Sequence, residues 1–244
     1  MKLITKIIII AYSLVCLLCD EKPVNIWKGK TLPLDFINTI LSVHNNYRSK
    51  IANGGADTSN GKMTPATNMV QLYWSKKLSR KAQLIANDCL FKSSGEQFRS
   101  NAGEFVGESI YLKAHKGDVK PELMDWEDAI ESWYKERLNF DVGDILKYQS
   151  FPKTKAFTQI AWANTRFIGC GYSAFKTKSG DTNQLYICHY SPGGNIVLKE
   201  MYNSQGKVCS KCPKNYECKS EYDGLCCLNN YCSKDSIEIK HRLK

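Results

Sequence analysis

The sequence predicts an α+β protein, with helices packed on an antiparallel sheet and a short disulfide-rich extension towards the C-terminal end. Three observations support this prediction. Apolar residues recur at three- and four-residue steps in the first half of the chain, which is typical of amphipathic helices. Between residues 166 and 191 the period falls towards two, as in strands. Six cysteines then occupy residues 209–232, a segment with almost no aliphatic side chains.

The first nineteen residues are typical of a secretory signal peptide. Lys2 and Lys6 precede an apolar run that ends at Leu18, and charge follows abruptly at Asp20. The run is too short to span a bilayer as a stable anchor, although an uncleaved N-terminal anchor is the alternative. We therefore expect residues 1–19 to be removed, and the mature protein to be secreted, extracellular, oxidised and without a transmembrane anchor.

The chain of 244 residues carries a formal charge of +10. In the cytosol such a balance would favour nucleic acid, but no DNA- or RNA-binding motif occurs, so we expect no nucleic-acid partner. Outside the cell, anionic glycans and lipid head groups are the partners that a basic protein favours. The sequence contains no Asn-x-Ser/Thr acceptor, so N-glycosylation is not expected.

Three amphipathic helices are predicted. The first spans residues 35–51 and the second spans 72–91, where a lysine-rich stripe opposite the apolar face is interpreted as a solvated surface. The third runs from Pro121 to about Leu138, because proline suits a first helical turn. The apolar faces are expected to carry Ile40 and His44, then Trp74 and Cys89, then Leu123, Trp126 and Trp133.

Strands follow the helices. Residues 166–176 and 184–191 alternate with a period near two, and the segment 178–182 between them has the composition of a turn. Residues 106–112 form a weaker third candidate. Helices combined with antiparallel strands predict one α+β domain.

The C-terminal segment from residue 204 to 244 is predicted to be a separate cysteine-rich extension with a basic tail. It has too few apolar side chains to build a core, so cross-links must hold it together. The CxxC at its start is compatible with zinc, but exported chains use such clusters mostly as disulfides. Six cysteines allow fifteen pairings, which the sequence leaves open. The expected disulfide cysteines are Cys209, Cys212, Cys218, Cys226, Cys227 and Cys232.

Several motifs closely resemble those of the CAP superfamily, which holds the cysteine-rich secretory (SCP), antigen 5 and pathogenesis-related proteins. The resemblance covers residues 35–203 and implies an α-β-α sandwich with a central groove, the CAP domain. The long loop 53–68 and the short cysteine-rich tail look like the venom-allergen-like branch of insects and parasitic worms. The motifs are Phe157-Thr-Gln-Ile-Ala-Trp-Ala-Asn-Thr165, Gly169-Cys-Gly171, Leu185-Tyr-Ile-Cys-His-Tyr-Ser-Pro-Gly-Gly-Asn195, His44-Asn-Asn-Tyr-Arg48, Gly107-Glu108-Ser109 and Trp133-Tyr-Lys-Glu136.

Family members often place two histidines and two glutamates in the groove, where they can hold zinc. By resemblance, Glu108 and Glu136 match the two glutamates, but the histidine positions fall on Ser93 and Ala156. Imidazole suits zinc, whereas two carboxylates alone prefer a hard cation or water. We therefore interpret both acids as remnants of a groove site and expect no metal and no other cofactor.

The missing imidazoles also weaken an enzymatic interpretation. General base catalysis near neutral pH usually falls to histidine, and a nucleophilic serine needs such a partner. The sequence lacks a Gly-x-Ser-x-Gly elbow and a His-Glu-x-x-His motif. We expect no catalytic residues and no protease activity.

The resemblance implies that Cys170 and Cys188 form a disulfide between neighbouring strands. Cys89 has two alternatives: a buried inert thiol, or a partner in the tail, which would leave one tail cysteine free.

The remaining class of function is binding. Relatives bind sterols, fatty acids or small lipid mediators, and the loop 139–155 corresponds to a sterol-binding loop in some of them. Its residues Phe140, Leu146, Tyr148 and Phe151 do not match that pattern cleanly, and simple packing is the alternative. We expect a secreted non-enzymatic protein that binds sterol or fatty acid, or a host protein, at a parasite–host or salivary interface. The alternative is a secreted modulator of a receptor or ion channel that acts through the cysteine-rich tail.

Overall fold

The computed structural model describes residues 23–27, 29–95 and 103–232. The expected signal peptide and the basic end of the chain lie outside the described residues. Within them, no helix combines the length and the apolar character that a membrane span requires. The helices are α2 (Leu34–Ala52), α3 (Lys76–Ala86), α5 (Trp126–Lys135) and α6 (Lys155–Ile160), with 3₁₀ turns η1 (Glu136–Asn139), η2 (Val142–Ile145) and η3 (Pro152–Thr154); the strands are β1 (Tyr73–Trp74), β2 (Gly107–His115), β3 (Phe167–Lys176), β4 (Thr182–Ser191), β5 (Tyr216–Glu217) and β6 (Cys227–Leu228).

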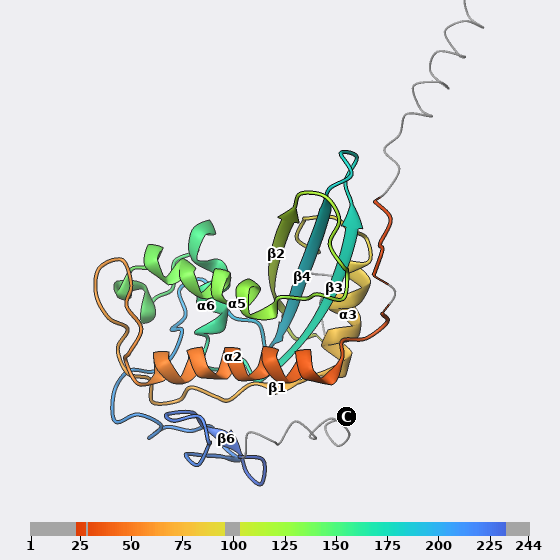
Figure 1. Ribbon diagram of the computed structural model, residues 1–244. Helices are drawn as coiled ribbons and strands as arrows, with labels where there is room; N and C mark the ends of the chain where they lie inside the picture. Colours follow the sequence, from red (N-terminus) through yellow and green to blue (C-terminus); the bar gives the residue numbers. More distant parts are fainter. Residues whose placement is uncertain (1–22, 28, 96–102, 233–244) are drawn as a thin grey trace, which may run out of the picture.

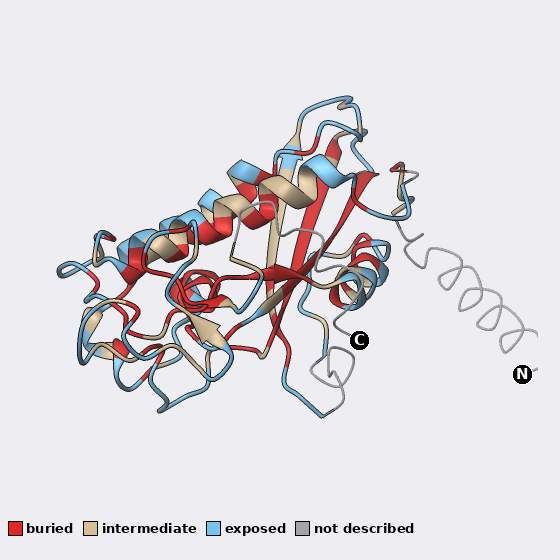
Figure 2. Ribbon diagram, turned by 90° about the horizontal axis from the view of Figure 1, so that it is seen from below, coloured by how far each residue is buried: buried red, intermediate tan, exposed pale blue. Residues whose placement is uncertain are grey.

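Four strands form the main sheet in the order β1-β3-β4-β2. The long strands pair antiparallel, and the short β1 pairs parallel to β3. The register places Cys170 directly opposite Cys188, and a disulfide joins them. The same register places Glu108 opposite His189. Figure 1 shows the three long strands running side by side, and Figure 2 shows that β3 and β4 are mostly buried, whereas most of β2 is of intermediate burial.

Helices cover both faces of the sheet, so the α-β-α sandwich predicted from the sequence is confirmed. Helix α3 packs on β3 and β4, while α5 and α6 approach β2 from the other face and α2 packs on α5. Two glycines of β3 allow the approach of α3. A Cβ atom at Gly169 would lie 2.3 Å from the amide nitrogen of Ser79, and one at Gly171 would lie 2.3 Å from that of Gln83.

The predicted boundaries of two helices were wrong. The second helix begins at Lys76 rather than at residue 72, because Tyr73 and Trp74 pair with β3 and the Ser75 hydroxyl caps the helix by accepting the Leu78 amide. It ends at Ala86, so Cys89 follows the helix in a left-handed backbone conformation with φ 55°. Local periodicity could not separate a buried two-residue strand from the helix that follows it.

The third helix begins at Trp126 rather than at Pro121. The Asp125 side chain accepts the Asp128 amide at its start, so the residues before it form turns. Leu123 therefore does not share the buried face and is mostly exposed. The sequence analysis also missed α6, whose six residues are too few to show a helical period.

A buried arginine ties α2 to the segment that follows α6. Arg48 is fully buried, and its guanidinium donates hydrogen bonds of 2.5–3.4 Å to five backbone carbonyls, but to no carboxylate among the described residues. Desolvation lowers its pKa to about 9, so it remains charged at neutral pH. The carbonyls of Val70, Ile160, Trp162, Ala163 and Thr165 share this cation.

The cysteine-rich extension packs against the CAP-like domain. Three disulfides hold it: Cys209–Cys218, Cys212–Cys226 and Cys227–Cys232. Its backbone pairs with the domain, since the Cys226 amide donates to Met69 and the Cys226 carbonyl accepts from Gln71. The Leu228 amide also donates to the Tyr73 hydroxyl at 2.7 Å. Of the alternatives for Cys89, the structure has the free, buried thiol.

Candidate functional site

Glu108 lies near the start of β2, and protein donors surround its carboxylate. The side chain is 2% exposed. One oxygen accepts hydrogen bonds from the Ser93 hydroxyl at 2.9 Å and the Ser94 amide at 3.0 Å; the other accepts from the Ser94 hydroxyl at 2.5 Å and lies 3.2 Å from His189 Nε2. Four contacts match the acceptor capacity of a carboxylate. Ser93 therefore lies beside Glu108, where the resemblance implies a histidine.

His189 is a residue of this site that the sequence analysis did not predict. Its side chain is fully buried on β4, and Nδ1 has no hydrogen-bond partner among the described residues. The signal that could have found it is strand register: once β2 and β4 are aligned, Glu108 and His189 are direct neighbours. Periodicity within one strand cannot supply that alignment.

Glu136 follows the last residue of α5, and its carboxylate caps the start of α6. One of its oxygens accepts the Ala156 amide at 2.7 Å and the Phe157 amide at 3.2 Å. Burial raises the pKa of Glu136, and these two hydrogen bonds oppose that effect. Ala156, the second position where the resemblance implies histidine, therefore contributes a backbone N–H rather than a metal ligand.

The described residues contain one group of at least three potential metal ligands with mutually close ligand atoms. It consists of Cys209, Cys212 and Cys226, and it lies in the extension rather than in the groove. All three sulfurs belong to disulfides, so none is available as a thiolate.

A pocket of about 550 Å³ opens where α2 and α3 begin. Its apolar wall comes from Leu32, Ile37 and Trp74, and two cations, Lys76 and Arg80, lie along its edge. Arg80 also borders a second hollow of about 500 Å³ next to Trp27. Helical periodicity predicts a solvated stripe for both cations and gives no sign of the pocket, because its walls come from two segments that are distant along the chain, 31–37 and 74–80.

The loop 139–155 divides between core and surface. Phe140 and Tyr148 are buried in the main core, so packing accounts for both. Leu146 and Phe151 are more than half exposed. The four residues therefore do not form one aromatic binding surface.

The fold and these motifs define a class of protein: a three-layer α-β-α domain with hydrogen-bonded carboxylates at Glu108 and Glu136 and a disulfide-bonded extension. The family model described as "Cysteine-rich secretory protein family" (CAP) matches residues 41–190. The chain belongs to this family, in its venom-allergen-like branch.

Curated relatives include venom proteins of arthropods. "Venom allergen 5" of Tityus serrulatus is 34% identical over 82% of this chain and 49% of its own length. "Scoloptoxin SSD43" of Scolopendra dehaani is 31% identical over 89% of this chain and 98% of its own length. The chain spans about half the length of several curated relatives that it matches.

Solved structures agree with this assignment. BmVAL-1 is 28% identical and covers 82% of this chain and 97% of its own, with a TM-score of 0.66. A crystal structure described as NaASP2 with Zn²⁺ is 27% identical, covers 82% of this chain and 98% of its own, and has a TM-score of 0.64.

Proposed function

We propose that the protein is a secreted, non-enzymatic CAP protein that carries a small apolar ligand with an anionic group, a fatty acid in preference to a sterol. The observation that carries this proposal is the pocket between the first turns of α2 and α3. Its volume of about 550 Å³ lies in the range of small-molecule sites, and its wall is mainly apolar with a few polar groups.

The two cations at the edge of the pocket favour a fatty acid. Arg80 forms no ion pair within the described part of the chain, and its guanidinium can bind a carboxylate through two parallel hydrogen bonds. Trp74, Leu32 and Ile37 offer an apolar surface for the acyl chain. A sterol would leave Arg80 without a counter-charge.

The groove argues against catalysis. Every donor that contacts the Glu136 carboxylate is a backbone amide, and Glu108 is bound by two serines and His189. A general base must reach a substrate proton, but both carboxylates already accept hydrogen bonds from the protein itself.

The groove does not fit zinc either. Zinc sites usually contain three or four side-chain ligands, with imidazole or thiolate prominent among them. Here Ser93 and Ala156 stand at two of the expected ligand positions, and the Glu108 carboxylate is fully hydrogen-bonded. The Zn²⁺ named for the NaASP2 structure is therefore not carried over to this chain.

The proposal is tested by native mass spectrometry and lipid extraction on protein secreted from eukaryotic cells, followed by uptake of labelled fatty acid and labelled sterol. We expect stoichiometric fatty acid and no retained zinc. Arg80→Ser should weaken fatty-acid uptake about tenfold, the loss expected for a charged hydrogen-bonded pair. Lys77→Ser is the matched control, because Lys77 is exposed on the same helix but does not line the pocket.

Three outcomes would contradict the proposal. Absence of uptake of both lipids by folded protein would remove the carrier function, and stoichiometric zinc would require the groove to be interpreted as a metal site. Equal uptake by Arg80→Ser and Lys77→Ser would place the ligand elsewhere in the protein.

The alternative function, modulation of a receptor or channel through the tail, has less support from the geometry. The described part of the extension packs on residues 66–73, so much of its surface is used within the molecule. Truncation at residue 204 would expose Val70, so a clean test uses substitutions of exposed tail residues such as Lys214→Ser. If Lys214→Ser lost binding of a receptor or channel but retained lipid uptake, the result would favour a function of the tail.

A further inference from the structure

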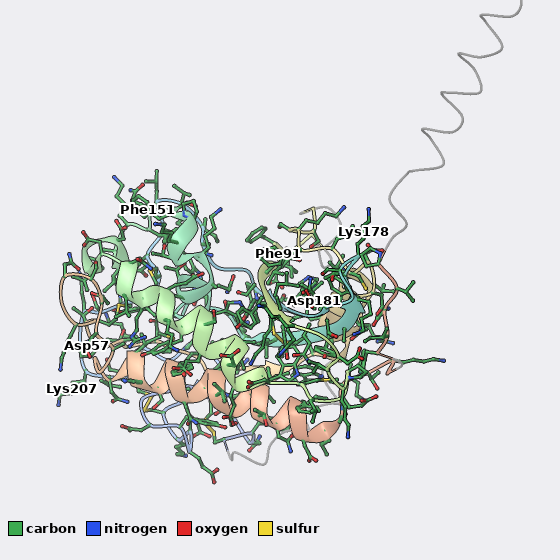
Figure 3. All side chains as sticks on the ribbon, turned by 45° about the horizontal axis from the view of Figure 1, so that its top comes forward. Asp57, Phe91, Phe151, Lys178, Asp181 and Lys207 are labelled. Atoms are coloured by element: carbon green, nitrogen blue, oxygen red, sulfur yellow. A yellow bond between two sulfur atoms is a disulfide. The ribbon has the colours of Figure 1, made fainter. Side chains whose placement is uncertain are left out.

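A cluster of large apolar side chains is exposed on residues that do not line the pocket. We call it the apolar turn patch and define it as Leu146, Phe151, Ile196, Val197 and Leu198, each 45–58% exposed. Single exposed apolar residues are common, but consecutive ones are unusual in soluble proteins unless they serve a function. Figure 3 shows Phe151 at the periphery of the molecule, far from the turn that carries Lys178 and Asp181.

The two segments of the patch are held side by side by the backbone. The Leu198 amide donates to the Tyr148 carbonyl at 3.0 Å, and the Tyr148 amide donates to the Lys199 carbonyl at 2.9 Å. The Asn195 side chain donates to the Lys155 carbonyl at 2.8 Å. These hydrogen bonds hold the two segments that carry the patch next to each other.

The centre of the patch is a tight turn with an unfavourable residue. The Lys199 amide donates to the Ile196 carbonyl at 3.1 Å, which closes a four-residue turn. Leu198 occupies the third position with φ 65°, where glycine or asparagine is usual. A leucine in the left-handed region costs about 1 kcal/mol or more in strain. Its exposed side chain gains little from packing in return.

Lysines surround the patch. Lys147, Lys153, Lys155 and Lys199 are all exposed, and none takes part in the ion pairs of the described residues. The segments 145–155 and 195–200 contain only one acidic residue, Glu200. The patch therefore combines exposed apolar side chains with exposed lysines on the same two segments.

We propose that the apolar turn patch docks the protein on the surface of a bilayer that contains anionic phospholipids. Aliphatic and aromatic side chains enter the boundary between head groups and acyl chains, and flanking lysines bind the phosphates. Lysine is depleted at protein–protein interfaces, so the same composition disfavours a protein partner and a second copy of the chain. This inference does not depend on the ligand pocket, which lies on other elements.

The test is flotation of the secreted protein with vesicles of phosphatidylcholine alone or of phosphatidylcholine with phosphatidylserine. We expect binding to the anionic vesicles that falls as salt is raised, and much weaker binding to the neutral ones. Leu198→Asn should reduce binding about tenfold, since it removes an aliphatic side chain from the tip. It should not unfold the protein, because asparagine tolerates a positive φ better than leucine.

Leu123→Asn is the matched control, because Leu123 is 64% exposed but lies outside the patch. Its binding should equal that of the unmodified protein. The proposal is overturned if the folded protein ignores anionic vesicles, or if Leu198→Asn and Leu123→Asn bind equally. It is also overturned if Leu198→Asn converts a dimer to a monomer without any vesicle binding, which would make the patch an interface between copies.

Discussion

The buried imidazole of His44 should make the protein lose stability in acid. His44 lies within α2, fully buried, with Nδ1 at 2.8 Å from the Ile40 carbonyl and Nε2 at 3.0 Å from the Tyr190 hydroxyl. A carbonyl only accepts, so Nδ1 carries the proton and Nε2 accepts from Tyr190. A second proton would place a new cation in the core, one helical turn from the buried charge of Arg48.

The magnitude follows from the pKa. Burial, the largest cause, lowers the pKa of His44 from 6.5 to about 4. Above pH 6.5 both folded and unfolded chains hold neutral imidazole, and the stability is fully present. Between pH 6.5 and pH 4 only the unfolded chain binds the proton, so the free energy of unfolding decreases; below pH 4 the loss is complete. The total is about 3 kcal/mol.

The assay is urea unfolding at several pH values from 7.5 to 4, on the unmodified protein and on His44→Gln. Glutamine should lower the stability at neutral pH but remove the decrease attributed to His44. His115→Gln removes an imidazole that is only partly buried, and should retain that decrease. The raised pKa of Glu136 acts in the opposite direction: the folded protein binds that proton more readily, so this group adds stability as the pH falls. The informative quantity is therefore the difference in the free energy of unfolding between the unmodified protein and His44→Gln at each pH. Parallel pH profiles for the unmodified protein and His44→Gln would refute the reasoning.

Three further predictions concern buried groups. Arg48→Lys should lower the free energy of unfolding by about 3 kcal/mol, because one ammonium cannot satisfy the carbonyls that the guanidinium binds. The control Lys50→Ser, at an exposed position, should change it by less than about 0.5 kcal/mol. Equal effects of the two substitutions in urea unfolding would contradict the role of Arg48. Cys89 should resist a thiol reagent in the native protein, since burial raises the pKa of its thiol, and it should react once the chain is unfolded in urea. A fast reaction of the native protein, or no reactive thiol after unfolding, would be inconsistent with a buried free cysteine. Glu136→Ala should lower the free energy of unfolding by about 1 kcal/mol, because it leaves two amides of α6 without an acceptor. Glu136→Gln should lower it less, because the glutamine carbonyl oxygen still accepts hydrogen bonds from both amides. The reverse order in thermal unfolding would exclude a capping role.

The fold class could be predicted because it depends on local patterns. Alternation along residues 166–176 and 184–191 marked the two central strands; in the structure the first begins one residue later and the second two residues earlier. The first helix was predicted within one residue at each end, since its apolar period is sustained over several turns. The predicted starts of two helices were wrong, at residues 72–75 and 121–125. There a strand pairing or a side-chain cap sets the first helical residue, and periodicity alone does not show it.

Only part of the candidate site could be predicted from the sequence. Glu108 and Glu136 could be found from short motifs, but their partners could not. His189 reaches Glu108 through strand register, and Ala156 reaches Glu136 through a backbone amide that every residue type except proline would offer. The pocket beside Trp74 and the apolar turn patch each join segments that are distant along the chain.

The sequence by itself determined the α+β class, the family and the cysteine-rich character of the extension, because these reside in residue types and their spacing. Only the tertiary structure decided which cysteines of the extension pair, how the carboxylates of Glu108 and Glu136 are hydrogen-bonded, and which cations and apolar side chains meet at a surface. These properties depend on distances between residues far apart in the chain, and those distances are fixed by strand register and helix packing rather than by local preference.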